Sequence, residues 1–387
     1  MKKKALIVVN LAGFLHFLWN DISTLQEMGY EVSVAMNENS AAGPNLIEIP
    51  KLEEMEIAHY QVDFDTKSPI SRQNVQAYKQ LKLILKRNKY ELIHCHTSIV
   101  GILTRMAARK ERKDGTTVIY TTHGFAFTDR SSKKSWLVYF TTEKLMSRFC
   151  DAIITINHED YNNAKKMHCP NVYVIPSVGL DNKRFADVKT NRDEYRASFG
   201  VKPNDHMVLS VGELSSRKNQ KIIVDALGMI DRKEQYVFVI CGTAVVNSTI
   251  EEELKRKASE LGVRIFLAGH RLDIPEINHC ADVAVIPSIR EGFGMTGVEA
   301  LASGVLVVGS DVQGIREYVI PEKTGYLCDP YSPNQFADAI EKIVNLSPEV
   351  KKQMEASCKK KAEEFDVSKS IAAMKNIYKE VLYHDRK

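Results

Sequence analysis

The chain has 387 residues, of which 44% are hydrophobic and 26% are charged, and its formal net charge is +4 at pH 7. This balance is typical of a globular protein of roughly two to three domains and excludes a low-complexity or disordered chain. No apolar run approaches the ~20 residues of a membrane span. The apolar segment after the basic start is too short for a signal peptide.

Cysteine usage and charge distribution indicate the compartment and the partners. Seven cysteines are scattered singly, with neither C-x-x-C nor zinc spacing, so we expect a reducing, cytoplasmic location. Residues 1–178 hold 23 Lys and Arg against 18 Asp and Glu, and eleven of these basic residues lie between Arg72 and Lys113. Such a density is either a solvated helix face or a surface for anionic lipid headgroups. No nucleic-acid partner is expected.

Apolar runs of strand length alternate with helical stretches in two series. The first runs through residues 4–10, a helix at 17–28, then 31–36, 91–95, 117–122 and 151–156. The second runs through 207–212, a helix at 219–229, 236–242, a helix at 250–261, 264–269, 283–287 and 305–310. This alternation predicts an α/β fold of two Rossmann-like, doubly wound parallel-sheet domains that face a cleft. We expect them at residues 1–178 and 179–367, with the helix at 368–387 packing back on the first.

Two nucleotide-binding motifs are absent and one metal motif is doubtful. The turn after the first strand contains only Gly13 where G-x-G-x-x-G would be needed, which disfavours NAD or FAD, and there is no Walker A sequence. Asp63-Phe64-Asp65 has the D-x-D form of metal-dependent sugar transferases. Its position before a turn and a capped helix favours a solvated loop, so no metal or other cofactor is expected.

Histidines follow two strands of the first domain. His123 ends one strand and precedes a glycine, so it either faces a cleft or is a buried structural histidine. His94 and His96 share one face of the preceding strand. With no third ligand evident in the sequence, they do not predict a metal site.

Basic residues follow two strands of the second domain. Arg217 and Lys218 lie at the predicted start of the helix at 219–229, where cations oppose the helix dipole. That placement favours a bound diphosphate between them, although an exposed basic loop is the alternative. Arg271 follows another strand and either lines the same sheet edge or lies on the surface.

Two carboxylates, Glu291 and Glu299, lie eight positions apart across the glycine-rich turn after the strand at 283–287. Backbone N–H groups at Gly294 to Thr296 would face a phosphate there, and the carboxylates would accept hydrogen bonds from sugar hydroxyls. In the alternative interpretation Glu291 is a solvated loop residue, and Thr296 and Glu299 form a capping box in the first helical turn.

These motifs together resemble a known family over nearly the whole chain. The Gly13 turn, THGF around His123, IPSVGLDNKRF, VGELSSRKN, LAGHRLDIPEINHCADVAVIPS and the E-x7-E of Glu291 and Glu299 occur in the expected order. They resemble the retaining GT-B glycosyltransferases of the family 4 type, in the bacterial polysaccharide and glycolipid branch. The resemblance implies a metal-independent transfer of a sugar from a nucleotide sugar, most simply a UDP-sugar, to a glycan or lipid-linked acceptor.

The resemblance also implies residue roles. Glu291 would contact the sugar, Glu299 the ribose and Lys218 the diphosphate, with His123 near the primary hydroxyl of the sugar. The implied catalytic residues are His123, Lys218 and Glu291; the donor-binding residues are Gly13, Arg217, Arg271, Arg290, Gly292, Phe293, Gly294, Met295, Thr296 and Glu299; His96 and Phe125 lie on the acceptor side. Family members often have arginine where this chain has Glu213, and we expect Arg217 to supply that charge.

Two other functions fit the same fold: a nucleotide-sugar epimerase and a non-catalytic nucleotide-sugar or glycan binding protein. The segment from Trp136 to Phe140, after two lysines, either contacts the inner face of the cell membrane or belongs to the core. The sequence therefore predicts a cytoplasmic enzyme, and a peripheral contact with anionic membrane is one of two alternatives for this segment.

Overall fold

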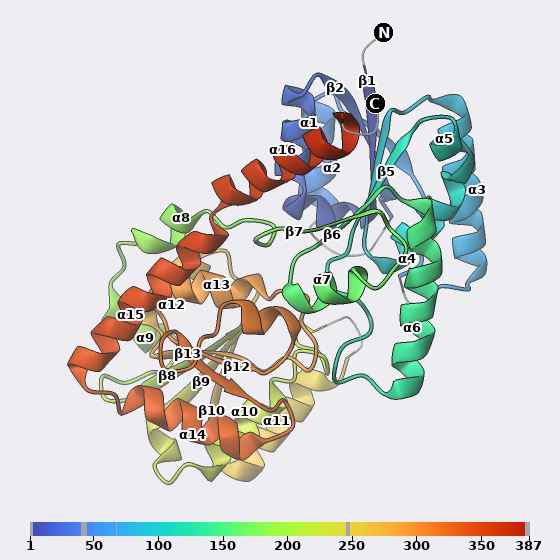
Figure 1. Ribbon diagram of the computed structural model, residues 1–387. Helices are drawn as coiled ribbons and strands as arrows, with labels where there is room; N and C mark the ends of the chain where they lie inside the picture. Colours follow the sequence, from blue (N-terminus) through green and yellow to red (C-terminus); the bar gives the residue numbers. More distant parts are fainter. Residues whose placement is uncertain (1–2, 40–44, 67, 245–247, 384–387) are drawn as a thin grey trace. The chain divides into compact units, whose positions relative to one another are not determined.

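The computed structural model describes residues 3–39, 45–66, 68–244 and 248–383, and the chain divides into two compact units (Figure 1). Unit 1 comprises Met1–Val178 and Ser368–Lys387, and unit 2 comprises Gly179–Val367. Each unit contains its own parallel β-sheet with helices packed against it. The predicted fold class, two Rossmann-like doubly wound domains, is confirmed.

Unit 1 has a seven-stranded sheet in the order β3-β2-β1-β4-β5-β6-β7. The central strands are apolar and buried along their length because helices cover a doubly wound sheet on both faces, as the fully buried β4 and β6 illustrate. The strands are β1 (Lys3–Leu11), β2 (Tyr30–Asn37), β3 (Ala58–Gln61), β4 (Leu92–His96), β5 (Thr117–Thr121), β6 (Ala152–Thr155) and β7 (Asn171–Val174).

The helices of unit 1 connect successive strands, and the C-terminal helix α16 belongs to the same unit. Tyr378 of α16 is buried against β4, and Lys375 pairs with Glu27 of α1 at 3.0 Å. The helices are η1 (Ala12–Phe17), α1 (Trp19–Glu27), α2 (Asn45–Glu54), α3 (Arg72–Arg87), α4 (Ser98–Ala107), α5 (Arg109–Lys113), α6 (Lys133–Met146), η2 (Ser147–Phe149), α7 (His158–Ala164) and α16 (Val367–Tyr383).

Unit 2 has a six-stranded sheet in the order β10-β9-β8-β11-β12-β13. Its strands are β8 (His206–Val211), β9 (Tyr236–Cys241), β10 (Arg264–Gly269), β11 (Val283–Ile286), β12 (Val307–Ser310) and β13 (Gly325–Cys328). Its helices are α8 (Asn182–Ala186), α9 (Arg192–Ser198), α10 (Lys221–Met229), η3 (Lys233–Gln235), α11 (Ile250–Leu261), α12 (Ile274–Cys280), α13 (Met295–Ala302), η4 (Gln313–Glu317), α14 (Pro333–Val344), α15 (Pro348–Ala362) and η5 (Glu363–Phe365).

In each sheet the strand order reverses at one point, between β1 and β4 in unit 1 and between β8 and β11 in unit 2. Doubly wound sheets bind ligands outside the carboxyl ends of the strands at such switch points, because the two flanking loops diverge there. The loops after β8 and β11 carry Lys218 and Glu291, and the corresponding positions of unit 1 carry Gly13 and His96.

Some boundaries differ from those the sequence predicts. The predicted helix at 17–28 is a 3-10 helix over Ala12–Phe17 followed by α1, and the helix predicted from residue 219 begins at Lys221. Asn219 has a φ of +56°, which no helix accommodates, so Arg217 and Lys218 lie in the preceding turn. The argument from an unfavourable helix dipole therefore does not apply to them. Among the described residues, no helix is both long enough and apolar enough to cross a membrane.

Candidate active site

The loops after β8 and β11 are joined by backbone and side-chain hydrogen bonds. Ile289 N donates to Arg217 O at 2.9 Å, and the Asn219 side chain donates to Pro287 O at 3.2 Å. Because β8 and β11 are neighbours in the sheet, these bonds hold the two loops together at the switch point. Arg217 and Lys218 are thereby fixed beside Glu291.

Glu291 is the centre of this junction. Its Oε2 accepts hydrogen bonds from Lys218 Nζ at 2.5 Å, Ser288 Oγ at 3.1 Å and Arg217 Nη1 at 3.4 Å. The Glu291 and Lys218 side chains are only 12% and 14% exposed, whereas Arg217 is 42% exposed. Burial alone would raise the pKa of Glu291, but Lys218 and Arg217 outweigh it and lower that pKa. Glu291 is therefore an ionised acceptor, and the interpretation of it as a solvated loop residue is wrong.

Helix α13 begins at Met295, and Gly294 precedes it with a left-handed φ of +84° and no side-chain cap. Thr296 lies inside the helix, and its hydroxyl is buried without a hydrogen-bond partner among the described residues. The capping-box interpretation is thus wrong, and Glu299 is the fifth residue of the helix rather than part of its first turn. The first N–H groups of a helix have no intrahelical partner, so those at the start of α13 are available to an anion.

Glu299 is half-buried, and its carboxylate makes no hydrogen bond or ion pair with any residue that the structure describes. Burial raises its pKa from the ordinary 4.5 to about 7, with Arg184 acting weakly in the opposite direction. A buried carboxylate without partners is costly to the fold. Such a group is typical of a position where a ligand supplies the missing donors.

No sequence pattern indicated a role for Tyr318, which follows η4. Its hydroxyl is buried and without a hydrogen-bond partner in the described part of the chain. Burial, and then the charges of Glu291 and Glu299, raise the pKa of Tyr318 well above its usual value, so the phenol lies close to both carboxylates. A Cβ at Gly294 would come 2.9 Å from this hydroxyl, and one at Gly297 would meet the ring itself. The two glycines admit Tyr318 to the site.

The other predicted donor-binding residues differ in their placement. Gly292 and Phe293 pack next to Gly314, and the Phe293 ring lies 5.2 Å from that of Phe365. The Arg290 side chain, in contrast, is exposed, and the Arg290 carbonyl accepts a hydrogen bond from Arg217. Arg271 follows the edge strand β10, two strands away from β8, and its guanidinium pairs with Asp273 at 2.5 Å. The structure therefore does not bring Arg271 into the junction around Glu291.

Glu213, which stands where the family often has arginine, is exposed in the loop after β8. Its carbonyl accepts from Gln220 at 2.8 Å. Next to it, Gly212 has a φ of +144°, and a Cβ there would lie 3.4 Å from the Lys218 stem. The cation nearest to Glu291 besides Lys218 is Arg217, the residue we expected to replace the missing arginine.

Unit 1 contains a second polar cluster, at the carboxyl ends of β4 and β5. His96 Nδ1 and His123 Nε2 lie 3.2 Å apart, and His123 also packs edge-on against Phe14. Burial lowers the pKa of His123 to about 4 and that of His96 well below its usual range. Both are therefore neutral at pH 7. His96 Nε2 is buried without a partner among the described residues, and His96 is one of the residues that line a small cavity of about 20 Å³.

A third candidate metal ligand, which the sequence did not reveal, joins His94 and His96. Asp21 of α1 places a carboxylate oxygen within 4.8 Å of ligand nitrogens of both histidines. Burial raises the pKa of Asp21 to about 7. His94 bonds Tyr378 at 2.8 Å and Thr121 at 2.7 Å through its two nitrogens. A divalent transition metal would fit here only if His94 gave up one of these bonds.

Three remaining predictions concern unit 1. Phe125 is 1% exposed and stacks on Phe127 at 4.8 Å, so its side chain belongs to the core. Gly13 lies in η1, directly after β1. Asp63 accepts hydrogen bonds from Gln61 at 2.7 Å and Gln80 at 2.8 Å. These bonds engage both carboxylate oxygens of Asp63 and hold it within its loop. This is the arrangement of a structural loop residue.

Comparisons with known proteins match both units. The family model Glycosyltransferase Family 4 matches residues 18–178, and the model Glycosyl transferases group 1 matches residues 191–365. EpsD of Bacillus subtilis, described as a glycosyltransferase, is 31% identical over 376 residues, which cover 96% of this chain and 93% of EpsD. The UDP-Gal:alpha-D-GlcNAc-diphosphoundecaprenol alpha-1,3-galactosyltransferase of Escherichia coli is 29% identical, over 80% of this chain and 82% of that protein.

Solved structures match the whole fold. HepE of Anabaena, solved in complex with UDP and glucose, superposes with a TM-score of 0.77 at 20% identity, covering 99% of this chain and 100% of HepE. Sucrose-phosphate synthase from Thermosynechococcus elongatus gives a TM-score of 0.78 at 18% identity, covering 99% of this chain and 100% of the synthase. At these identities the likeness concerns the fold.

Proposed function

Since this chain belongs to the family 4 type of GT-B glycosyltransferases, we propose that it transfers a sugar from a UDP-sugar to a hydroxyl of a lipid-linked glycan, with retention at the anomeric carbon. The observation that carries the proposal is the buried Lys218–Glu291 ion pair at the switch point of unit 2, next to the unpartnered carboxylate of Glu299. The UDP in the HepE complexes and the donor and acceptor in the name of the Escherichia coli relative support the choice of substrates.

Each part of the donor has a chemically matched group in the junction. Ribose hydroxyls would donate to Glu299, which has no donor of its own in the described residues. The diphosphate would lie against the first N–H groups of α13 and against Lys218. Glu291, held ionised by Lys218, would accept from hydroxyls of the transferred sugar.

The proposed acceleration comes from stabilising the leaving diphosphate. Lys218 is oriented by Glu291 before the substrate binds, so its charge is preorganised where negative charge develops. A phosphate oxygen of the departing nucleotide would remove the acceptor proton on the same face, which accounts for retention without a protein nucleophile. Glu291 would orient the sugar and would not attack it. No metal ion is needed for these steps.

The acceptor side is proposed to contact an anionic membrane through α6. The sequence left open whether Trp136 and Phe140 contact the membrane or belong to the core. Their rings stack on each other at 4.4 Å and pack edge-on against Phe127, so they belong to the core. The residues between them, Leu137, Val138 and Tyr139, are 62%, 56% and 46% exposed. Exposed lysines Lys133 and Lys134 begin the same helix. Apolar side chains beside lysines suit the interface of an anionic bilayer.

The test is a transfer assay with purified protein, a panel of UDP-sugars and a lipid-diphosphate glycan acceptor, with the released UDP and the glycolipid product measured by mass spectrometry. Lys218→Ala should lose at least ~100-fold in turnover, as expected for removing one preorganised stabilising group. Lys221→Ala, an exposed lysine at the first position of α10, is the matched control and should keep normal turnover. Near-normal turnover of Lys218→Ala would reject the proposed site.

The same assay separates the alternatives. A transferase releases UDP in proportion to glycosylated acceptor. An epimerase would convert the UDP-sugar without acceptor and without UDP release. A binding protein would retain UDP-sugar in equilibrium dialysis but produce neither product. Either of the last two outcomes with a full panel of donors would overturn the proposed transfer.

A further inference from the structure

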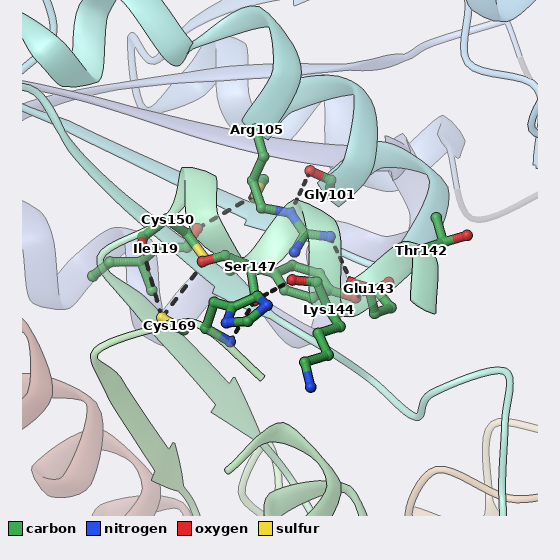
Figure 2. Close-up of polar contacts among 12 residues, drawn as sticks. Gly101, Arg105, Ile119, Thr142, Glu143, Lys144, Ser147, Cys150 and Cys169 are labelled. Atoms are coloured by element: carbon green, nitrogen blue, oxygen red, sulfur yellow. Dashed lines mark hydrogen bonds and ion pairs between the residues drawn. The ribbon is translucent and has the colours of Figure 1, made fainter. Parts of the chain in front are cut away.

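Two cysteines of unit 1 meet where β6 and β7 begin, whereas the histidine cluster of that unit lies at the carboxyl ends of the strands. The Sγ atoms of Cys150 and Cys169 lie 3.7 Å apart (Figure 2). Ala152 and Asn171 are paired in the β6–β7 ladder, and each cysteine precedes its paired residue by two positions. Neighbouring parallel strands lie about 4.8 Å apart. A disulfide needs Cα atoms about 4.4–6.8 Å apart, so side-chain rotation is enough to form one here.

The pair lies beside a buried cation. Arg105 of α4 donates to Gly101 O at 2.9 Å and to Glu143 at 2.7 Å, and both of its partners are seen with the two cysteines in Figure 2. Its Nη1 is buried and has no hydrogen-bond partner among the described residues. Glu143 therefore leaves part of the hydrogen-bonding capacity of the guanidinium unsatisfied, and a thiolate at Cys150 would add negative charge beside it.

The electrostatic balance favours that thiolate. The hydrogen bond with Cys169 and the charge of Arg105 lower the pKa of Cys150, against the opposing effects of burial and Asp151. The same shared hydrogen bond raises the pKa of Cys169, so the pair gives up one proton readily and holds the second. A dithiol that carries one shared proton is the reactive form for disulfide chemistry.

Access from solvent is provided by one member of the pair. Of the seven cysteines, all of which the structure describes, Cys169 is half-buried and the other six are buried. Cys169 lies between α7 and β7, two residues after Met167 and directly before Pro170. An oxidant reaching Cys169 therefore has a second sulfur in contact behind it.

We propose that Cys150 and Cys169 form a redox-active dithiol that hydroperoxides oxidise to a reversible intramolecular disulfide. In the first step the shared proton passes to Cys150, which donates to Cys169 in the structure, and the Cys169 thiolate, the sulfur that solvent reaches, attacks the peroxide. The O–O bond breaks, Cys169 sulfenic acid forms, and the leaving hydroxide takes the proton of Cys150 as water. In the second step the Cys150 thiolate attacks the sulfur of Cys169 and expels hydroxide, which regains from solvent the proton that the pair gave up on ionising. The sum is two thiols and one hydroperoxide giving one disulfide and two waters when the oxidant is hydrogen peroxide. A thiol reductant reverses it by exchange.

The test uses the folded full-length chain. The reduced protein is treated with a small excess of hydrogen peroxide, its free thiols are blocked with N-ethylmaleimide during unfolding, and tryptic peptides are measured by mass spectrometry. We expect a linked pair of peptides containing Cys150 and Cys169, lighter by about 2 Da than the two thiol peptides, which dithiothreitol separates. The other five cysteines should remain alkylated.

Variants make the result specific. Cys150→Ser and Cys169→Ser should each abolish the linked peptide, and Cys169 in the former should proceed to sulfinic acid for lack of a resolving thiol. Cys358→Ser, a buried cysteine of unit 2, is the matched control and should leave the linkage unchanged. Absence of any linked peptide in the native chain, a link from Cys150 to the nearby Cys95, or a link between two chains would each overturn the proposal.

Discussion

Replacing Glu299 by glutamine should stabilise the ligand-free protein at alkaline pH and weaken donor binding. Burial raises the pKa of Glu299 from 4.5 to about 7, so the folded chain keeps a proton that the unfolded chain releases. Stability then falls as the pH rises from 4.5 to 7. The shift of about 2.5 pKa units corresponds to at most about 3 kcal/mol above pH 7, at ~1.4 kcal/mol per unit. Glutamine removes this cost because it does not ionise.

The assay is equilibrium denaturation of the ligand-free protein at pH 4.5 and pH 8. The free energy of unfolding of Glu299→Gln should exceed that of the natural chain by up to about 3 kcal/mol at pH 8 and should match it near pH 4.5. Glu252→Gln, on the exposed face of α11, is the control and should change stability little at either pH. Destabilisation by Glu299→Gln at both pH values would refute the reasoning and indicate a structural role in α13.

The binding arm uses calorimetric titration with UDP. Ribose hydroxyls donate to the ionised carboxylate, so UDP affinity of the natural chain should rise as the pH passes through about 7. Loss of hydrogen bonds to a charged group, about 1.5–3 kcal/mol, predicts that Glu299→Gln binds UDP roughly 10- to 100-fold more weakly at pH 8. Its affinity should not vary with pH across this range. A natural chain whose UDP affinity is constant from pH 6 to 8 would contradict the ribose contact.

Three further outcomes follow from the structure. Gly297→Ala should lower the free energy of unfolding by about 1–3 kcal/mol in the same denaturation assay, because its Cβ would meet the buried Tyr318 ring; full stability would show that Tyr318 can move aside. Transfer activity should persist in EDTA, and its loss would implicate Asp21 and the histidines next to it, or Asp63, in holding a metal. Leu137→Asp combined with Val138→Asp should reduce co-sedimentation with anionic liposomes at low salt, whereas Leu272→Asp, at a leucine of unit 2 that is 80% exposed, should not; a natural chain that does not bind such liposomes would reject the membrane contact.

The fold could be predicted because a doubly wound sheet leaves a strong pattern in the sequence. Strands such as β8 and β11 are buried on both faces and therefore read as continuous apolar runs. Edge strands of only four residues leave a weak pattern, and β3, β7 and β13 escaped prediction for this reason, whereas the six-residue edge strand β10 was predicted. The proximity of Lys218 and Glu291 also follows from the pattern, since the loops after two adjacent strands meet at the sheet edge.

The rest of the site depends on tertiary packing. Asp21 approaches His94 and His96 because α1 packs against the sheet, and nothing in the spacing of these three residues indicates it. Tyr318 occupies the space that the missing side chains of Gly294 and Gly297 leave at the start of α13, which only the three-dimensional path of η4 reveals. Likewise, the turn that holds Lys218 depends on the left-handed backbone of the next residue, a conformation that sequence periodicity does not report.

Charge balance in the junction explains how a glutamate is tolerated at position 213. Lys218 and Arg217 provide two positive charges against the single ionised carboxylate of Glu291, while Glu299, with a pKa of about 7, is about half protonated at neutral pH. The junction thus already holds an excess cation before any diphosphate binds. The Arg217 side chain donates two long hydrogen bonds, to Glu291 and to Arg290 O, each of 3.4 Å, and it is 42% exposed, so turning it towards a phosphate breaks little. Glu213 is exposed, where solvent screens its repulsion of that phosphate. On the proposed function, Arg217 rather than an additional arginine therefore completes the anion site, and Lys218 stays bound to Glu291 while it does so.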